Sequence, residues 1–236
     1  MTSYHAHLES GSYYHIYNRG NNKESIFLDE DNYLYFLTKW KKYLHPFVDT
    51  LAYCLMPNHF HFLIKVKPED NFTKLSTANN LTKSQRLGKI DFSVKVKNVD
   101  SFTKLQKFSK AEQQSSDVNK FLENQFKGLF TSYALAFNKQ QNRTGSLFQK
   151  RFKRVQIEDN ENITRLIHYI HHNPIHHGFV QKYENWRYCS YNAITEDRAT
   201  LIDKQEVLKW FDGKEQFHLF HQEMKYFEGD IYIDNS

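Results

Sequence analysis

Apolar and polar residues follow two different periods along the first 70 residues of the chain. Alternation with a period of two indicates a half-buried strand, and recurrence every three to four residues indicates a helix. We therefore expect strands at 13–18, 47–56 and 59–66, the last two joined by a turn at Pro57. Between the first two strands, a helix opens at the acidic residues 29–31. Its apolar face comprises Tyr33, Phe36, Leu37, Trp40 and Leu44.

The second half of the chain repeats the helix–strand order. A long helix is expected from about residue 118, with an apolar stripe at Val118, Phe121, Leu122, Phe126, Leu129, Phe130, Tyr133 and Phe137. A strand at 152–158 and a further helix at 159–172 follow. Asn160 or Asn162 is expected to cap that helix, and Asn173–Pro174 to begin its end. The order predicts an α+β, ferredoxin-like (βαββαβ) antiparallel sheet with helices on one face plus a C-terminal helix.

Composition changes sharply at two places. Residues 68–117 are polar and weakly periodic, which is typical of an insertion or a long loop. Residues 196–236 are acidic and aromatic. We therefore expect one domain over 1–195, with a polar insertion at about 68–117, followed by a C-terminal extension.

The strand at 59–66 places two histidines on one face. Because successive side chains of a strand alternate, His59 and His61 share a face with Leu63 and Lys65. The opposite face carries only apolar residues and is expected to pack on the helices. Residues two apart on a strand lie roughly 6–7 Å apart, so two imidazoles can converge on one divalent ion. The alternative is two polar residues on a solvated face.

The helix at 159–172 offers further candidates. Tyr169 lies about 110° from the middle of its apolar stripe, at the flank, and Asn173 follows one turn later on the same side. An amide oxygen can bind a hard divalent ion, and a phenol beside that ion can act as a nucleophile on phosphorus. The alternative for Tyr169 is an aromatic that packs a helix edge. The stripe itself consists of Ile163, Leu166, Ile167 and Ile170.

Charge and cysteine content set the broad class. The 236 residues carry a formal charge of +5 and a pI of about 8.9, which permits an anionic partner without requiring one. The two cysteines form no visible disulfide framework, so a reducing, cytoplasmic location is expected. We expect no membrane span and no signal peptide.

Basic and aromatic residues are interleaved in the segment "NRTGSLFQKRFKR" at 142–154. Cations there can contact phosphates while Phe148 and Phe152 stack on unpaired bases. The alternative is a solvated turn and strand edge. A polar turn near the start of the chain can also contact a base or phosphate. The candidate DNA-binding residues are Asn18, Arg19, Arg143, Lys150, Arg151, Lys153 and Arg154.

Five segments occur in an order that resembles a known family. They are "YYHIYNRGNN", "CLMPNHFHFLIKV", "FNKQQNRTGSLFQKRFK", "RLIHYIHHNPIHHGFV" and "NWRYCSY". Over roughly residues 10–193, the chain resembles the REP-associated tyrosine transposase branch of the single-tyrosine transposases with a His–hydrophobic–His motif.

The resemblance implies a metal-dependent endonuclease and strand transferase that acts on single-stranded or hairpin DNA. It implies Mg²⁺ or Mn²⁺ as cofactor, and cleavage that leaves a 5′-phosphotyrosine and a free 3′-hydroxyl. By position, His59 and His61 match the metal-binding pair, Asn173 the third ligand and Tyr169 the catalytic nucleophile. The resemblance leaves open whether the tyrosine acts within one chain or across a homodimer. The insertion at 68–117 is longer than compact members of the branch need.

Tyr133 is also a helical tyrosine, but it falls on the apolar stripe of its helix and is therefore predicted to be core.

Two alternative functions are consistent with the same fold. The first is a non-catalytic single-stranded nucleic-acid-binding module, because a ferredoxin-like sheet can bind unpaired bases without cutting them. The second is a metal hydrolase in which the ion activates water in place of tyrosine.

Overall fold

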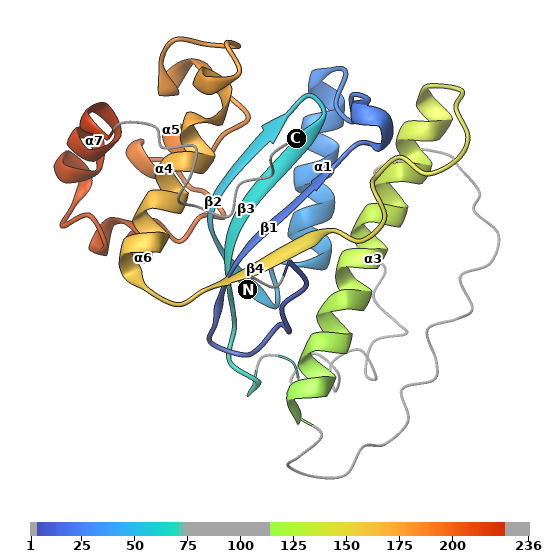
Figure 1. Cartoon of the computed structure of the whole chain (residues 1–236), viewed down its shortest axis with the longest axis horizontal. Coiled ribbons are helices and arrows are strands. Elements are labelled where there is room, and N and C mark those ends of the chain that lie inside the picture. The colour runs from blue at the N-terminus through green and yellow to red at the C-terminus, as the bar shows by residue number, and fades with distance from the viewer. Residues whose placement is uncertain (1–3, 71, 73–113, 225–236) are drawn as a thin grey trace.

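A computed structural model of the chain describes residues 4–70, 72 and 114–224. Its four strands form one antiparallel sheet in the order β2-β3-β1-β4, with a helix between β1 and β2 and another between β3 and β4 (Figure 1). This confirms the ferredoxin-like fold. The elements are β1 (Tyr13–Arg19), α1 (Glu30–Tyr43), β2 (Val48–Met56), β3 (His59–Val66), α3 (Gln114–Gln140) and β4 (Lys153–Ile157).

One face of the sheet packs on α1 and α3, as the strand pattern predicted. Phe60, Phe62 and Ile64 of β3 are fully buried there, and Phe62 stacks on Trp40 of α1 with ring centroids 3.6 Å apart. Each such side chain contributes about 1.5–3 kcal/mol by leaving water. Tyr133 of α3 lies in the same core and donates its hydroxyl to the carbonyl of Ile26, so its prediction as a core residue is confirmed.

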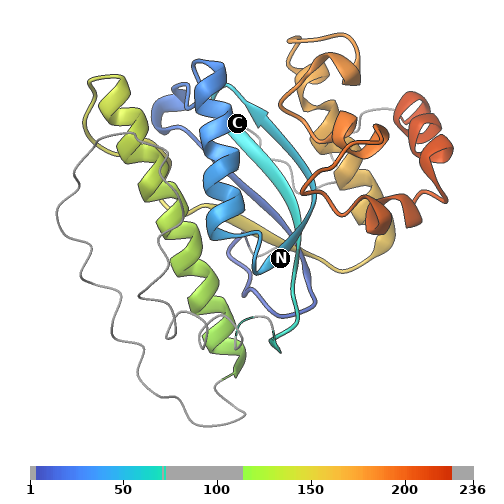
Figure 2. The ribbon, with the colours of Figure 1, turned by 180° about the vertical axis from the view of Figure 1, so that it is seen from behind.

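The opposite face is also covered, which the alternation alone did not predict. Helix α4 (Asn160–His176) lies against β2 and β3, and three further helices pack with it into a second core (Figure 2). The alternative of a solvated face for His59 and His61 is therefore wrong, because His61 is buried and His59 is half-buried beneath α4. The additional helices are α5 (Tyr191–Thr195), α6 (Lys204–Lys209) and α7 (Lys214–Glu223), and the short 3₁₀ turns are η1 (Asn21–Lys23) and η2 (Tyr183–Asn185).

Both ends of α4 differ from the sequence expectation. The cap is Asp159, whose carboxylate accepts a hydrogen bond from the Asn162 backbone N–H at 2.7 Å, and not Asn160 or Asn162. A carboxylate at this place also compensates the positive end of the helix dipole. The helix continues past Pro174 to His176, because a proline near the C-terminal end leaves most of the hydrogen-bond ladder intact.

The expected insertion at 68–117 falls almost entirely outside the described residues. The expected extension after residue 195 supplies Ile202, Val207, Phe211 and Phe217 to the second core. Among the residues that the structure describes, no helix is long and apolar enough to cross a membrane.

Candidate active site

Pairing between β1 and β3 brings polar side chains together on the face covered by α4. The register sets Tyr17 opposite His61 and Arg19 opposite His59. Residues directly opposite each other in an antiparallel pair share a face of the sheet. His15, Tyr17 and Arg19 of β1 therefore stand beside the two histidines of β3.

Helix α4 brings Tyr169 and Asn173 to the same place. Asn173 Oδ1 lies 3.2 Å from His59 Nε2, although the two residues are 114 positions apart. The Tyr169 ring meets the His61 ring edge-on, with centroids 5.3 Å apart. Tyr169 is only 6% exposed and His61 only 2% exposed. The two histidines, the amide and the phenol thus meet within one chain.

The hydrogen bonds of His59 indicate how a cation would fit. Its Nδ1 lies 2.7 Å from Asn58 Oδ1, and its Nε2 faces Asn173 Oδ1. A neutral imidazole has one N–H and can donate to only one of these oxygens. When Nδ1 donates to Asn58, the Nε2 lone pair meets the lone pairs of Asn173. A divalent ion at that point would use both, so these residues fit a metal.

His15 is a residue that the sequence reasoning did not include. Its Nε2 lies 3.0 Å from His61 Nδ1, it is fully buried, and its ring stacks on that of His61. Burial lowers the pKa of His15 to about 3 and holds the pKa of His61 well below its usual range, so both rings are neutral near pH 7. When His61 Nδ1 donates to His15, the lone pair of His61 is left on Nε2, the nitrogen available to a metal.

Replacement of His15 tests this arrangement. His15→Leu removes the acceptor, and we expect Mn²⁺ affinity to fall by about 10–100-fold, the usual effect of losing an outer-shell partner of a metal-binding histidine. His15→Gln, whose amide oxygen can accept the same hydrogen bond, is expected to lose less. Titration calorimetry measures the affinity, a thermal melt establishes that each variant is folded, and His45→Leu is the matched control. An unchanged affinity in folded His15→Leu would contradict the assignment.

Arg19 contributes a buried positive charge to the site. It is 8% exposed, and its Nε and Nη1 have no hydrogen-bond partner within the described part of the chain. Its charge helps to lower the pKa of His177, after the effects of burial and of His176, and the His177 ring lies 5.4 Å from that of His59. A buried guanidinium with unused donors is costly unless an anion binds it.

Hydrogen bonds through two buried histidines hold α4 in position. His221 of α7 donates its Nδ1–H to the Phe217 carbonyl at 2.8 Å, so its Nε2 accepts. His171 of α4 therefore donates from Nδ1 to that Nε2 at 2.9 Å, and its own Nε2 accepts from the Ser190 hydroxyl at 2.8 Å. We call Ser190, His171 and His221 the histidine chain.

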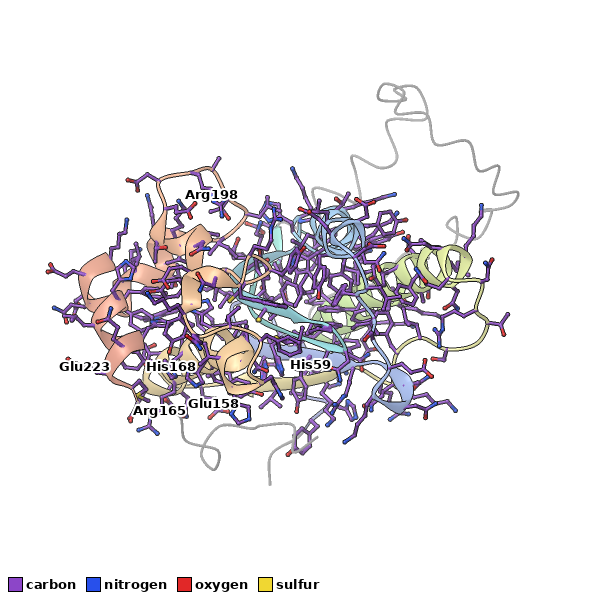
Figure 3. The ribbon with its side chains drawn as sticks, turned by 90° about the horizontal axis from the view of Figure 1, so that it is seen from above. His59, Glu158, Arg165, His168, Arg198 and Glu223 are labelled. Carbon is purple, nitrogen blue, oxygen red and sulfur yellow. The ribbon has the colours of Figure 1, made fainter. Side chains whose placement is uncertain are left out.

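The histidine chain begins at the sheet, because the Tyr53 backbone N–H of β2 donates to Ser190 Oγ at 2.9 Å. His171 lies two residues from both Tyr169 and Asn173. In Figure 3, His168 lies on α4 among the C-terminal helices, whereas His59 lies on the sheet. The histidine chain thus fixes the helix that carries the candidate nucleophile between β2 and α7.

The predicted DNA-binding residues differ in their exposure and in the partners that they already have. Lys150 and Arg151 are exposed on the segment before β4, and Lys153 lies over the Tyr17 ring at 5.3 Å. Arg143 and Arg154 are engaged in ion pairs, with Glu24 at 2.9 Å and Glu123 at 2.6 Å. Their guanidinium groups already bind carboxylates. DNA contact by Arg143 and Arg154 stays a prediction, and their ion pairs count against it. Asn18 is buried and accepts a hydrogen bond from the Arg19 backbone N–H.

Two comparisons indicate the kind of protein that this chain resembles. The family described as "Transposase IS200 like" matches residues 9–125, which include the histidine pair and end before Tyr169. A Haemophilus influenzae (strain ATCC 51907 / DSM 11121 / KW20 / Rd) protein assigned by name to the REP-associated tyrosine transposases is 22% identical over 148 residues. That match covers 63% of this chain and 61% of that protein, so the chain spans about three fifths of the length of this curated relative.

A solved structure of a REP-associated tyrosine transposase bound to a REP hairpin is also similar. The identity is 15% and the TM-score 0.46, with 85% of this chain and 90% of that chain covered. The family match and the Haemophilus influenzae relative confirm the resemblance that the ordered motifs predicted.

Proposed function

We propose that this chain, a relative of the REP-associated tyrosine transposases, is a metal-dependent endonuclease and strand transferase that acts on single-stranded or hairpin DNA. The observation that carries the proposal is the meeting of His59, His61, Asn173 and Tyr169 within one chain. Because all four come from the same molecule, we propose that Tyr169 acts in cis.

His59 Nε2, His61 Nε2 and Asn173 Oδ1 would hold Mg²⁺ or Mn²⁺. Among the described residues, no group of three or more His, Cys, Asp or Glu is placed to hold a metal, so the amide is needed to complete the set. When bound, the ion would polarise the scissile phosphate and offset its developing negative charge.

Tyr169 would be the nucleophile. Its phenol loses a proton as its oxygen attacks phosphorus, the bond from phosphorus to the 3′-oxygen breaks, and that oxygen leaves and takes up a proton. The products are a 5′-phosphotyrosine and a free 3′-hydroxyl. Because one phosphodiester bond replaces another and water takes no part, the step is reversible. Attack by the 3′-hydroxyl of another strand reverses the step and joins the two strands.

Arg19 would bind the phosphate that Tyr169 attacks. Its Nε and Nη1 have no partner among the described residues, so the guanidinium has donors for non-bridging phosphate oxygens. Lys150 and Arg151, on the exposed segment before β4, would contact the backbone of the bound strand, and Lys153 and Asn18 lie near them.

A doubly labelled hairpin tests the proposal. A panel of REP-type hairpins with single-stranded flanks is incubated with the protein and Mn²⁺, with a different label at each end. The 3′-labelled fragment is expected to become covalently attached to protein, while the 5′-labelled fragment is released with a 3′-hydroxyl. Peptide mass spectrometry is expected to find the nucleotide on Tyr169.

Other outcomes identify the competing functions. Binding of the hairpins with no cleavage of any panel member would indicate the non-catalytic module. Cleavage without a protein adduct would indicate hydrolysis by an ion-activated water. A label attached with the opposite polarity would exclude a 5′-phosphotyrosine.

A further inference from the structure

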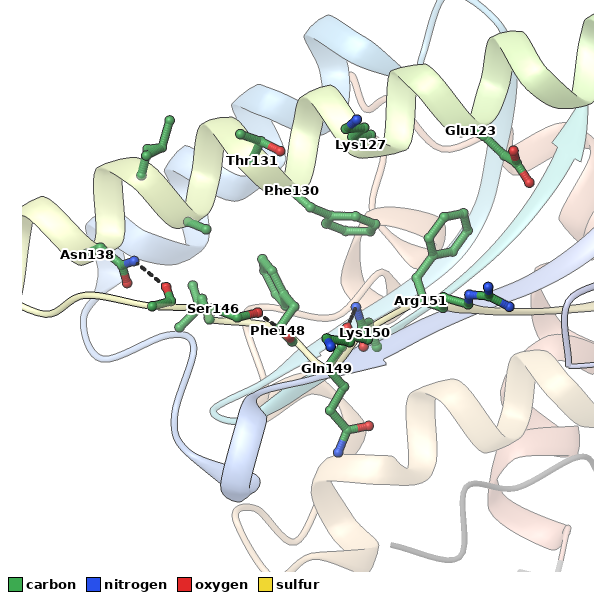
Figure 4. A pocket seen from close by; sticks show the side chains of 16 residues that line it. Glu123, Lys127, Phe130, Thr131, Asn138, Ser146, Phe148, Gln149, Lys150 and Arg151 are labelled. Atoms are coloured by element: carbon green, nitrogen blue, oxygen red, sulfur yellow. Dashed lines mark hydrogen bonds between the residues drawn. The ribbon is translucent and has the colours of Figure 1, made fainter.

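A pocket of about 540 Å³ lies between α3 and residues 145–152 (Figure 4). It is on the opposite face of the sheet from Tyr169, because its aromatic side chains pack with the core formed by α1, α3 and the sheet. Its volume is in the range typical of small-ligand sites. None of the residues assigned above to catalysis or metal binding lines it.

Three phenylalanines form the apolar wall of the pocket. Phe130 of α3 lies between Phe148 and Phe152, with ring centroids 5.2 Å and 5.5 Å from theirs. Phe148 is buried, whereas Phe130 and Phe152 are partly accessible. The pocket therefore presents aromatic surface to a planar apolar group.

The rim of the pocket is positively charged. Lys127, Lys150 and Arg151 are exposed there, and none forms an ion pair with any residue that the structure describes. The carboxylate that lines the pocket, Glu123, is bound by Arg154 at 2.6 Å. Arg151 also has a backbone φ of 63°, a conformation uncommon for residues other than glycine and frequent at ligand sites.

We propose that this pocket receives an unpaired nucleobase, with the flanking phosphates on Lys127, Lys150 and Arg151. A planar base stacks on aromatic rings, and its phosphates need cations, so the two halves of the pocket match the two halves of a nucleotide. Paired bases are already stacked within a duplex, so the pocket selects single-stranded segments or loops. The choice of DNA as the strand rests on the proposed function.

Contacts at the end of β1 connect this pocket to the catalytic face. Asn18 lines the pocket, and its neighbour Arg19 points to the other side of the sheet. The Gln149 backbone N–H donates to the Arg19 carbonyl at 2.8 Å, which ties the pocket segment to β1. A single-stranded DNA that passes around this end of the sheet can therefore occupy the pocket and the candidate active site together.

Substitution at the rim tests the inference without disturbing the core. Leu135 lines the pocket at 67% exposure, so Leu135→Glu adds negative charge there at little cost in folding. The probes are short single strands of DNA, each with one 2-aminopurine at a different position, in a buffer with a chelator and no divalent ion. Wild type is expected to quench one position strongly by stacking. Leu135→Glu is expected to remove that quenching and to weaken binding by about tenfold.

The matched control is Leu34→Glu, which makes the same change at a 51% exposed position on α1 outside the pocket, and it is expected to bind within about twofold of wild type. Wild-type binding by Leu135→Glu, or equal binding of a duplex of the same sequence, would overturn the inference. Because no cleavage is measured, the pocket can be established when no adduct ever forms, and it can fail while the adduct forms.

Discussion

Tyr169→Phe is expected to reduce covalent adduct formation by at least about a thousandfold, because it removes the one oxygen that would become bonded to phosphorus. Mn²⁺ affinity and hairpin binding in the absence of divalent ions are expected to stay at wild-type levels. The ring that packs against His61 is retained, so the variant is expected to fold normally. The measurement is the rate of adduct formation on the panel hairpin that wild type cleaves fastest.

Tyr133→Phe is the matched control for this prediction. Tyr133 is buried in the other core, its hydroxyl donates to the Ile26 carbonyl, and burial raises its pKa. Loss of that hydrogen bond is expected to cost about 1 kcal/mol of folding stability and to leave cleavage unchanged. An adduct that persists in Tyr169→Phe and disappears in Tyr133→Phe would mean that Tyr133, and not Tyr169, is the nucleophile.

Arg19→Ala is expected to slow adduct formation by about 100-fold at saturating DNA, because it removes the donors that we propose bind the phosphate as negative charge develops. Mn²⁺ affinity is expected to change little, since the arginine is not a ligand. Arg19→Lys keeps the charge but not the guanidinium donors and is expected to recover only part of the rate.

The stability of Arg19→Ala separates a functional role from a structural one. A buried, unpartnered guanidinium destabilises the fold, so its removal is expected to keep or raise the melting temperature. Arg165→Ala is the matched control: this arginine, labelled in Figure 3, is partly exposed on α4. It forms an ion pair with Glu161 one turn away. It is expected to cleave at the wild-type rate. A wild-type rate in Arg19→Ala, or a large fall in its melting temperature, would exclude a purely catalytic reason for this residue.

Periodicity in the sequence was sufficient to predict the sheet and its first layer of helices. The alternation in "HFHFLIKV" assigns Phe60 and Phe62 to one face and His59 and His61 to the other, and the structure has them so. It succeeds because the side-chain period of a strand is two whatever the strand pairs with.

The parts that could not be predicted depend on long-range pairing. Whether His15 meets His61 is decided by the register of β1 on β3, and no local pattern encodes that register. The orphaned donors of Arg19 likewise become apparent only when α4 covers the sheet. The cap at Asp159 was missed for a different reason: an aspartate and two asparagines compete within four positions, and side-chain geometry decides among them.

The histidine chain makes the C-terminal helices relevant to the chemistry. Helix α7 lies on the far side of α4 from the sheet, yet His221 binds the helix that carries Tyr169 (Figure 1). A deletion or proteolytic cut after residue 195 would leave His171 with an unsatisfied N–H and would free α4 to tilt. Shortened forms of this protein would then lose the alignment of the proposed site while His59, His61, Tyr169 and Asn173 are all still present.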